Sequence, residues 1–377
     1  MATQRVLDFL ATRRPSGPCL VVDLDVVGDN FRAFEKALPD SKIYYAVKAN
    51  PAPEILRLLA SMGSSFDCAS VAEIEMAMDA GASADRISFG NTIKKERDIA
   101  RAFELGIRLF AVDCVEEVDK VGRVARGARV FCRVLTDGEG AEWPLSRKFG
   151  CVPAMAVDVL RHARNLGLEA HGVSFHVGSQ QCDLTAWDRA LGDAKHVFEA
   201  LAEEGIVLKM VNMGGGFPTR YLRDVPVAQA YGQAIFGALR KHFGNRIPET
   251  IIEPGRGMVG NAGVIKSEVV LISKKSDNDN VRWVFLDIGK FGGLAETMDE
   301  AIRYPIVTAR DHDEKAPCVL AGPTCDSADV MYEKTPYPLP LSLTIGDDVL
   351  IEGTGAYTTT YASVAFNGFE PLRSYVI

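Results

Sequence analysis

Short apolar runs alternate with amphipathic stretches over more than half of the chain, and this alternation limits the possible folds more than any other feature. Eight runs are rich in Val, Ile, Phe and Tyr and have Gly or polar boundaries: 42–47, 64–68, 86–89, 108–112, 128–135, 170–176, 207–212 and 249–252. Such runs are typical of parallel strands buried on both faces. Five intervening stretches repeat apolar residues three and four positions apart, as covering helices do: 53–62, 71–80, 95–105, 152–166 and 186–204.

Eight strands with intervening helices match the size of a (β/α)8 barrel, although an open doubly wound sheet can be built from the same alternation. The residues that follow the runs favour the barrel. Chemistry-capable side chains or glycines come after nearly every run: Lys48, Asp67, Asn91, Asp113, His176, 214–216 and Glu253. In a barrel these strand ends meet at one mouth. We therefore predict an α/β fold with a TIM-type barrel.

The pattern changes after about residue 260. Strand-like segments at 264–272, 282–286, 318–321 and 348–352 follow one another without helices, and Pro and Gly interrupt them often. This arrangement predicts a second, all-β domain of sandwich or barrel-like form, with 18–23 as one of its strands. We expect the barrel to span 27–260 and the β-domain to combine 1–26 with 261–377.

Composition excludes several functional classes. Of 377 residues 47% are hydrophobic, and no stretch approaches the ~18 consecutive apolar residues of a membrane span. The net charge of −8, with both signs interspersed, argues against nucleic-acid binding. Eight cysteines without C-x-x-C spacing predict reduced thiols and no metal site. The first residues lack a signal-like apolar core, so we expect a soluble, cytoplasmic protein.

Lys48 follows the first predicted barrel strand in the stretch Tyr44-Tyr-Ala-Val-Lys-Ala-Asn50. A lysine at a barrel mouth loses its proton readily and can form a Schiff base with an aldehyde. A lone lysine at a strand end more often reaches solvent, so the surroundings must decide between these interpretations.

Two glycine-rich loops after the seventh and eighth strands are typical of a phosphate site. They are Val211-Asn-Met-Gly-Gly-Gly-Phe217 and Glu253-Pro-Gly-Arg-Gly257, and barrel phosphate sites commonly form at these strand ends. His176 could stack on a flat ring, or be an ordinary core histidine. Glu253 could keep a pyridine nitrogen protonated, so that the ring acts as an electron sink. Lysine, phosphate loops, stacking group and carboxylate together predict pyridoxal 5'-phosphate as cofactor.

The predicted β-domain carries two further motifs. Gly322-Pro-Thr-Cys-Asp-Ser-Ala-Asp329 places a thiol and two acids on one loop, although a free cysteine is often only a small buried hydrophobe. The segment 353–369 combines Gly, hydroxyls and aromatic residues, and Tyr357 within it could reach a phosphate.

These motifs resemble, in order and over nearly the whole chain, the barrel-type pyridoxal-phosphate-dependent amino-acid decarboxylases, which share the fold of alanine racemase. Within them they are most similar to ornithine decarboxylase. The matching segments are 45–50, 66–70, 148–150, 176–179, 214–216, 253–256, 322–326, 355–358 and 366–369.

The resemblance implies a role for each site residue. Lys48 would form the Schiff base, His176 would stack on the ring, and Glu253 would pair with the pyridine nitrogen. The phosphate would be held by Ser179, Gly215, Gly216, Gly255, Arg256 and Tyr357. Asp67, Glu73 and Arg133 would order the charges around the lysine. Cys325 would protonate the α-carbon after CO2 leaves, while Asp326 and Phe366 would contact the substrate. The Cys-Asp loop would enter the site of a second subunit, which implies a homodimer with shared sites.

One departure from the eukaryotic ornithine decarboxylases bears on the substrate. The stretch 285–299 lacks their Tyr-Asp pair near the distal amine, so Asp299, or Glu296 one helical turn earlier, would replace it. The shift could lengthen the pocket and leaves L-lysine open beside L-ornithine, as in bacterial ornithine or lysine/ornithine decarboxylases. The implied reaction is decarboxylation to putrescine, or cadaverine, in polyamine biosynthesis.

Three alternatives remain open from the sequence. Diaminopimelate decarboxylase shares several motifs but usually has Cys-Glu-Ser where this chain has Cys325-Asp-Ser. Alanine racemase needs a tyrosine base at the position of Cys325. A non-catalytic regulator similar to antizyme inhibitor would keep the fold but lose catalytic residues, whereas Lys48, His176 and Glu253 are present here.

Overall fold

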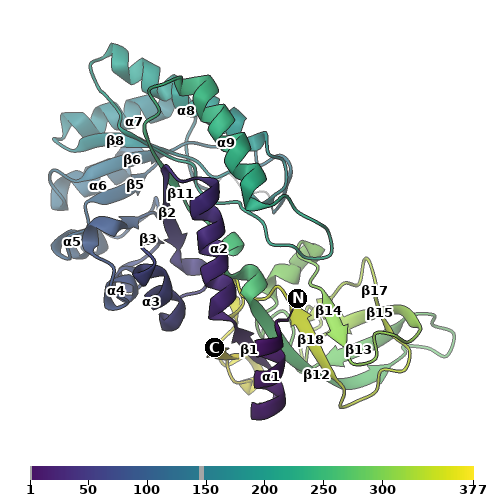
Figure 1. Cartoon of the computed structure of the whole chain (residues 1–377). Coiled ribbons are helices and arrows are strands. Elements are labelled where there is room, and N and C mark those ends of the chain that lie inside the picture. The colour runs from purple at the N-terminus through teal and green to yellow at the C-terminus, as the bar shows by residue number, and fades with distance from the viewer. Residues whose placement is uncertain (1, 144–147) are drawn as a thin grey trace. The chain divides into compact units, whose positions relative to one another are not determined.

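Eight parallel strands close into a barrel, as the alternation predicts (Figure 1). In order around the barrel they are β2 (Ser41–Ala46), β3 (Ser65–Cys68), β4 (Ile87–Phe89), β5 (Leu109–Val112), β6 (Arg129–Arg133), β8 (Glu169–Ser174), β10 (Met210–Asn212) and β11 (Glu249–Ile252). The barrel closes where Thr250 of β11 pairs with Ser41 of β2. The computed structural model describes residues 2–143 and 148–377.

Inward-facing side chains fill the barrel, so its centre is a packed core. The cluster comprises Tyr44, Leu109, Ala111, Phe131, Met210 and Ile251. Each is at most a few per cent exposed. Chemistry is therefore confined to the ends of the strands, as is usual for this fold.

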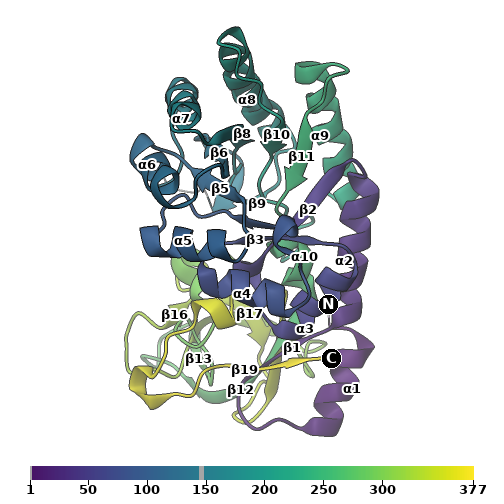
Figure 2. The ribbon, with the colours of Figure 1, turned by 90° about the vertical axis from the view of Figure 1, so that its left-hand side faces the viewer.

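Helices surround the barrel strands (Figure 2). They are α2 (Leu24–Ala37), α3 (Pro53–Ser61), α4 (Val71–Asp79), α5 (Glu96–Glu104), α6 (Val115–Val124), α7 (Pro153–Asn165), α8 (Ala186–Glu203) and α9 (Ala228–Phe243). Pro53 and Pro153 lie in the first turns of α3 and α7, where the missing N–H costs no helical hydrogen bond. The five predicted helices are all present, with ends that differ by one residue or so. Two short strands, β7 (Ala141–Trp143) and β9 (Ser179–Gln181), form a separate antiparallel pair that the sequence did not predict.

The remaining strands form one nine-stranded sheet, which confirms the predicted β-domain. Its strands are β1 (Cys19–Val22), β12 (Gly263–Ser273), β13 (Arg282–Leu286), β14 (Ile306–Thr308), β15 (Lys315–Ala321), β16 (Val330–Met331), β17 (Tyr337–Pro340), β18 (Asp348–Glu352) and β19 (Arg373–Val376). β1 runs antiparallel to β12 and parallel to β19. A short helix, α1 (Gln4–Arg13), begins at Thr3, whose hydroxyl accepts from the N–H of Val6.

The described residues divide into two units. One unit contains the barrel and consists of Gly28–Pro218 and Val225–Met258. The other contains the nine-stranded sheet and consists of the described residues of Met1–Val27, Thr219–Asp224 and Val259–Ile377. The grouping of Thr219–Asp224 with the sheet was not expected. Within the described ranges, no helix has both the length and the apolar character needed to cross a membrane.

Candidate active site

Five of the predicted site residues lie at the carboxyl end of the barrel. Lys48 belongs to the short helix η1 (Val47–Ala49) that follows β2, and Asp67 lies within β3. Arg133 ends β6, His176 follows β8, and Glu253 follows β11. Because all barrel strands run in the same direction, these five positions share one mouth, as the sequence predicted.

Asp67 is held in a space that a glycine leaves open. Its side chain is buried, and the hydroxyl of Ser88 donates to its Oδ1 at 3.0 Å. A Cβ at Gly90 would lie only 1.8 Å from the same oxygen, so any larger residue would displace the carboxylate. Burial raises the pKa of Asp67, while Lys48, Ser88 and Arg133 oppose that rise. The carboxylate thus depends on nearby cations to stay ionised.

The pKa of Glu253 is raised in the same way as that of Asp67, but Glu253 also accepts a hydrogen bond from the side chain of Asn212. Removal of Glu253 from water and the nearby charge of Asp67 raise its pKa to about 7, against the opposing effects of Lys48, Asn212 and Arg133. The side-chain amide of Asn212 donates to Oε1 at 2.5 Å. A carboxyl group with a pKa near neutrality can share a proton with a ligand nitrogen, which a normal glutamate would do poorly.

Glu73 helps to shape the same mouth through the start of α4. The hydroxyl of Ser70 caps the helix by accepting from the N–H of Glu73. The Glu73 carboxylate in turn accepts from the N–H of Ala69 at 2.6 Å, much as in a capping box. Burial raises its pKa, while Ala69 and Lys48 lower it and Asp67 adds to the rise. Helix capping therefore fixes a carboxylate within electrostatic reach of Lys48.

His176 is held in one tautomer. The backbone N–H of Gly178 donates to its Nδ1 at 3.1 Å, so the ring proton lies on Nε2. Burial lowers its pKa well below the usual value, and the cations Arg133 and Lys48 lower it further. The imidazole is therefore neutral. A neutral ring is suited to stacking on a flat ligand, and it does not bind a ligand through a positive charge.

The two glycine-rich loops and Ser179 together offer the groups that an anion needs. Arg256 is 4% exposed, and its Nη2 and Nε donate to the Ser179 hydroxyl at 3.2 and 3.4 Å. Gly255 and Arg256 follow Glu253 in the chain, with only Pro254 between them and the glutamate. A buried guanidinium beside a hydroxyl favours a phosphate or carboxylate.

Glycines are required beside this pair. A Cβ at Gly215 would lie 2.7 Å from the carbonyl of Glu253 and 3.1 Å from Nε2 of His176. A Cβ at Gly216 would lie 2.6 Å from the carbonyl of Gly178, and its φ of +103° is also unfavourable for other residues. The glycine triplet therefore packs against the His176 ring and against the backbone of Glu253 and Gly178, close to Arg256 and Ser179.

Together these groups fit pyridoxal 5'-phosphate. The mouth offers an amine at Lys48, a neutral imidazole, a carboxyl group near neutrality, and a glycine-lined cation–hydroxyl pair for a phosphate. A flat aromatic aldehyde that carries a phosphate and a basic ring nitrogen has a partner here for each of its groups. Among the described residues, no cluster of His, Cys, Asp and Glu could hold a metal ion.

The nine-stranded unit brings together the Cys-Asp loop and the C-terminal motif. Cys325 and Asp326 lie on an exposed loop. The side-chain oxygen of Asn367 accepts from the N–H of Cys325 at 2.8 Å. The buried Asp329 accepts from the hydroxyl of Thr324 at 2.8 Å and from the N–H of Lys290 at 2.8 Å. The loop backbone is therefore fixed while its thiol and carboxylate stay at the surface.

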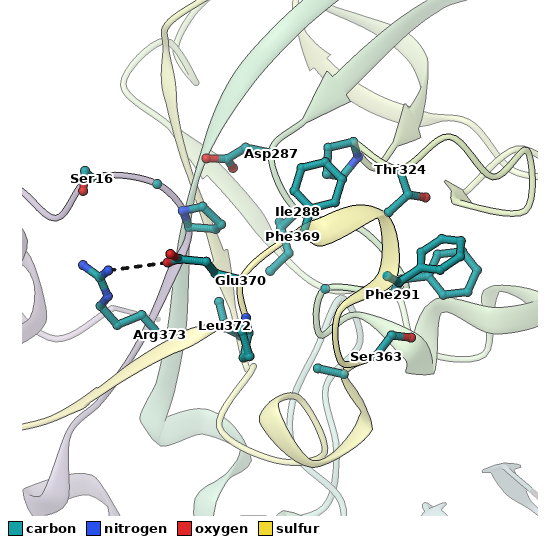
Figure 3. A pocket seen from close by; sticks show the side chains of 17 residues that line it. Ser16, Asp287, Ile288, Phe291, Thr324, Ser363, Phe369, Glu370, Leu372 and Arg373 are labelled. Carbon is teal, nitrogen blue, oxygen red and sulfur yellow. Dashed lines mark ion pairs between the residues drawn. The ribbon is translucent and has the colours of Figure 1, made fainter.

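A pocket of about 350 Å³ lies beside this loop (Figure 3). Phe366, predicted to contact substrate, lines it together with Thr324 and Phe291, and the rings of Phe291 and Phe366 lie 4.9 Å apart. Glu370 and Arg373 form an ion pair of 3.8 Å at its edge. Tyr357 lies in the turn after β18 with φ of +55°, and its ring is 5.7 Å from that of Tyr361.

The expectation that Glu296 and Asp299 lie one helical turn apart is wrong. The 3-10 segment η4 (Ala295–Glu300) is broken at Met298 and Asp299, which have non-helical backbone angles. Glu296 is 5% exposed, whereas the Asp299 side chain is 86% exposed and lies 3.5 Å from Lys334. The break therefore gives the two acids different environments.

Asn212 is the functional candidate that the sequence analysis missed. It ends β10, is 1% exposed, and its side-chain oxygen accepts from the N–H of Gly214 at 2.9 Å. One amide thus connects Glu253 to the first glycine of the triplet. Its place one residue before Met213-Gly-Gly-Gly, at a barrel strand end, was the available signal.

The barrel, the lysine at its mouth and the anion-binding loops define the class of barrel-type pyridoxal enzymes. Residues 24–260 match the family model described as the pyridoxal binding domain of pyridoxal-dependent decarboxylases. The chain belongs to this family, which confirms the predicted cofactor and fold.

Individual relatives agree with this assignment. The chain is 35% identical to a lysine/ornithine decarboxylase of Selenomonas ruminantium, over 97% of this chain and 91% of that protein. It is also 35% identical to antizyme inhibitor 2 of Xenopus laevis, over 93% of this chain and 78% of that protein. Among solved structures, a lysine/ornithine decarboxylase of Vibrio vulnificus, complexed with cadaverine, superposes with a TM-score of 0.89 over all of both chains at 30% identity.

Proposed function

We propose that this protein decarboxylates L-ornithine to putrescine and CO2, with L-lysine as a second substrate that would yield cadaverine. The observation that carries the proposal is the grouping of Lys48, Asp67 and Glu253 with the Arg256–Ser179 pair at one barrel mouth. Family membership supports decarboxylation as the reaction. The lysine/ornithine decarboxylases among the relatives support a basic diamino acid as the substrate.

In this proposal the barrel residues bind and orient the cofactor. Lys48 would hold it through Nζ, while Ser179, Arg256 and the N–H groups around Gly215, Gly216 and Gly255 would bind its phosphate. Tyr357 would add a hydroxyl to that phosphate. The neutral ring of His176 would stack on the cofactor. The positive charge of Arg133 would favour the ionised forms of Asp67 and Glu253, whose negative charges compensate the charge of Lys48.

When bound, the cofactor ring supplies a sink for the electron pair that remains on the α-carbon when CO2 leaves. The role of Glu253 is to hold a proton at the pyridine nitrogen, since a positive ring withdraws electrons best. Its pKa of about 7 suits this shared proton. Asn212 orients the carboxylate, because its amide donates to Oε1.

Cys325 and Asp326 would act on the substrate. The thiol of Cys325 would give a proton to the α-carbon, and the carboxylate of Asp326 would receive the distal amine, with Phe366 nearby. Both residues are exposed on a loop whose backbone is fixed, as expected for a loop that completes the site of a second copy of the chain. We therefore include a homodimer with shared sites in the proposal.

The acid that completes the distal end is Glu296 or Asp299. Glu296 is buried and Asp299 is paired with Lys334, so the two would respond differently to substitution. Glu296→Gln should raise the KM for both diamino acids if Glu296 contacts the amine. The same result from Asp299→Asn would assign the contact to Asp299.

The decisive experiment measures CO2 release from the purified protein with pyridoxal phosphate. L-ornithine, L-lysine, L-arginine and meso-diaminopimelate are offered separately. Turnover of ornithine together with slower turnover of lysine supports the proposal, whereas turnover of ornithine alone would remove lysine from it. Release from diaminopimelate or arginine alone would contradict the assigned substrate, although the reaction class would stand.

The similarity to antizyme inhibitor 2 favours one second candidate, a non-catalytic regulator. Such a protein would release CO2 from none of the four substrates and would not need the charges around Lys48. An absorbance band of bound cofactor, lost in Lys48→Ala, would argue against the regulator.

The shared site has its own test. Lys48→Ala and Cys325→Ala would each lose normal amine formation, and mixing the two purified variants should restore part of it once subunits exchange. No recovery after a mixing step that demonstrably exchanges subunits would contradict shared sites.

A further inference from the structure

Two buried cysteines lie in contact at the edge of the barrel mouth, and the proposed reaction uses neither. Cys132 lies in β6, directly before Arg133, and Cys151 lies after the loop that follows β6. Their Sγ atoms are 3.6 Å apart. Both thiols also approach the carbonyl oxygen of Arg133, at 3.9 and 3.7 Å. The peptide of a proposed site residue is thus flanked by two thiols.

The backbone holds the two cysteines together. The N–H of Cys151 donates to the carbonyl of Arg133 at 3.1 Å, and the N–H of Leu135 donates to the carbonyl of Cys151 at 2.9 Å. Residue 151 therefore pairs in parallel with Val134, as an isolated bridge beyond the end of β6. Gly150 allows this approach, since a Cβ there would lie 3.1 Å from backbone atoms of Val134 and Leu135.

We propose that Cys132 and Cys151 are a reversible dithiol–disulfide site that hydrogen peroxide oxidises and a thiol reductant restores. A disulfide has an S–S distance of ~2.05 Å, so the sulfur atoms must approach by about 1.5 Å. The site does not depend on the proposed substrate, because it rests only on the contact between the thiols.

The chemistry needs peroxide as its only co-reactant. The sulfur of Cys151 attacks one peroxide oxygen, the O–O bond breaks, and water leaves with the thiol proton, which gives a sulfenic acid at Cys151. The sulfur of Cys132 then attacks that sulfur, and the hydroxyl leaves as a second water with the Cys132 proton. Two thiols are oxidised by two electrons, and one peroxide is reduced to two waters.

Cys151 is the member of the pair that reacts first. It is 5% exposed, against 0% for Cys132. The contact between the two thiols also lowers the pKa of Cys151 and raises that of Cys132, where burial adds to the rise. The thiolate that attacks peroxide is therefore favoured at the more accessible sulfur, and its resolving thiol is already in contact.

Disulfide formation would change the surroundings of Arg133. The two sulfur atoms would no longer donate hydrogen bonds to the Arg133 carbonyl, and the end of β6 would move toward Cys151. The charges of Glu253, Asp67 and Asp113 act on the Arg133 guanidinium, so a shift of its backbone alters the balance at the mouth. We expect the oxidised protein to bind pyridoxal phosphate severalfold more weakly.

The first test maps the cross-link in the full-length protein. The reduced protein is treated with hydrogen peroxide, alkylated under denaturing conditions, digested and analysed by mass spectrometry. A peptide pair that joins Cys132 to Cys151, is lost on reduction, and dominates over other pairings supports the proposal. Cys68 is as buried as Cys132 and serves as the internal control. It should stay a free thiol during the peroxide treatment and be found alkylated.

Two results would overturn the site. In one, Cys132 and Cys151 are both alkylated after exposed Cys182 has been oxidised. In the other, the cross-link forms equally well in urea-unfolded protein, so the fold does not direct it. Cys132→Ser and Cys151→Ala should each abolish the cross-link, and circular dichroism checks that each variant is folded.

The second test follows cofactor binding by absorbance in the reduced, oxidised and re-reduced protein. Severalfold weaker binding after oxidation, restored by reductant, supports the coupling to Arg133. Cys151→Ala keeps every other cysteine and should lose this response. Unchanged affinity in fully cross-linked protein would overturn the coupling.

Discussion

The side-chain amide of Asn212 donates to the carboxylate of Glu253 at 2.5 Å, while its oxygen accepts from the N–H of Gly214. The amide thereby fixes the orientation of a carboxyl group whose pKa is already raised to about 7. Because the amide stabilises the charged carboxylate, its loss should raise that pKa further.

Asn212→Leu tests this relationship. We expect a higher pKa for Glu253, and a loss of folding stability of about 1–3 kcal/mol from the unsatisfied Gly214 N–H. The pKa is measured as the difference in proton uptake between each apo-protein and its Glu253→Gln counterpart. An identical titration in Asn212→Leu and the parent protein would show that the amide does not act on Glu253.

The pH dependence of stability gives a second prediction for Glu253 in the cofactor-free protein. The pKa rises from 4.5 to about 7 on folding, so folding favours the protonated form. This contribution is complete below about pH 4.5 and is lost as the pH rises through 7, by up to about 1.4 kcal/mol per pH unit. Urea unfolding from pH 5 to 8 measures it.

Glu253→Gln is the matched variant, since its amide does not titrate. The free energy of unfolding of the variant minus that of the parent should be larger at pH 8 than at pH 5. Parallel stability curves for the two proteins would contradict the raised pKa.

Lys48→Ala should abolish the cofactor absorbance band and nearly all turnover, because Nζ is the proposed attachment point. Lys42→Ala is the control at the other end of β2, where Lys42 is exposed and paired with Glu249 at 2.8 Å. The control should keep the spectrum and activity, since an exposed ion pair contributes at most about 1 kcal/mol. A normal spectrum in Lys48→Ala would refute the attachment point.

Cys325→Ala should retain the cofactor but protonate the substrate incorrectly, so that products of decarboxylation-dependent transamination appear. Product analysis by mass spectrometry, with the absorbance spectrum in parallel, detects both. Cys182→Ala removes another exposed thiol and should give only the normal amine. Clean amine formation by Cys325→Ala would remove the proposed role.

Gly215→Ala should prevent cofactor binding and destabilise the loop, because the new Cβ would lie 2.7 Å from the Glu253 carbonyl. Gly237→Ala is the control, since no atom lies within 4 Å of its Cβ position in α9. In that helix alanine should stabilise the protein by up to about 1 kcal/mol. Thermal melts and cofactor titration measure the two effects.

The barrel could be predicted from sequence because its local signals agree with its fold. β11 occupies Glu249–Ile252 as predicted, since a short apolar run with polar ends leaves little choice of boundary. The places of Lys48 and Glu253 at the barrel mouth could be predicted for the same reason, because the carboxyl ends of parallel strands meet at one end of the barrel.

The features that were missed depend on contacts distant in sequence or on backbone detail. β7 and β9 are three residues each and pair across a separation of almost forty residues. The break in η4 at Asp299, with φ of +54°, separates two acids that simple helical spacing places together. The contact between Cys132 and Cys151 requires residue 151 to pair beside β6, which no local pattern indicates.

The pairing of β1 has a consequence for synthesis on the ribosome. β1 spans Cys19–Val22, but its partners β12 and β19 begin at Gly263 and Arg373. The barrel strands all emerge before β1 can pair with β12, and β19 emerges later than β12. The barrel can therefore fold during translation while β1 stays unpaired, and a chaperone that binds short apolar segments would find Cys19–Val22 exposed for most of that time.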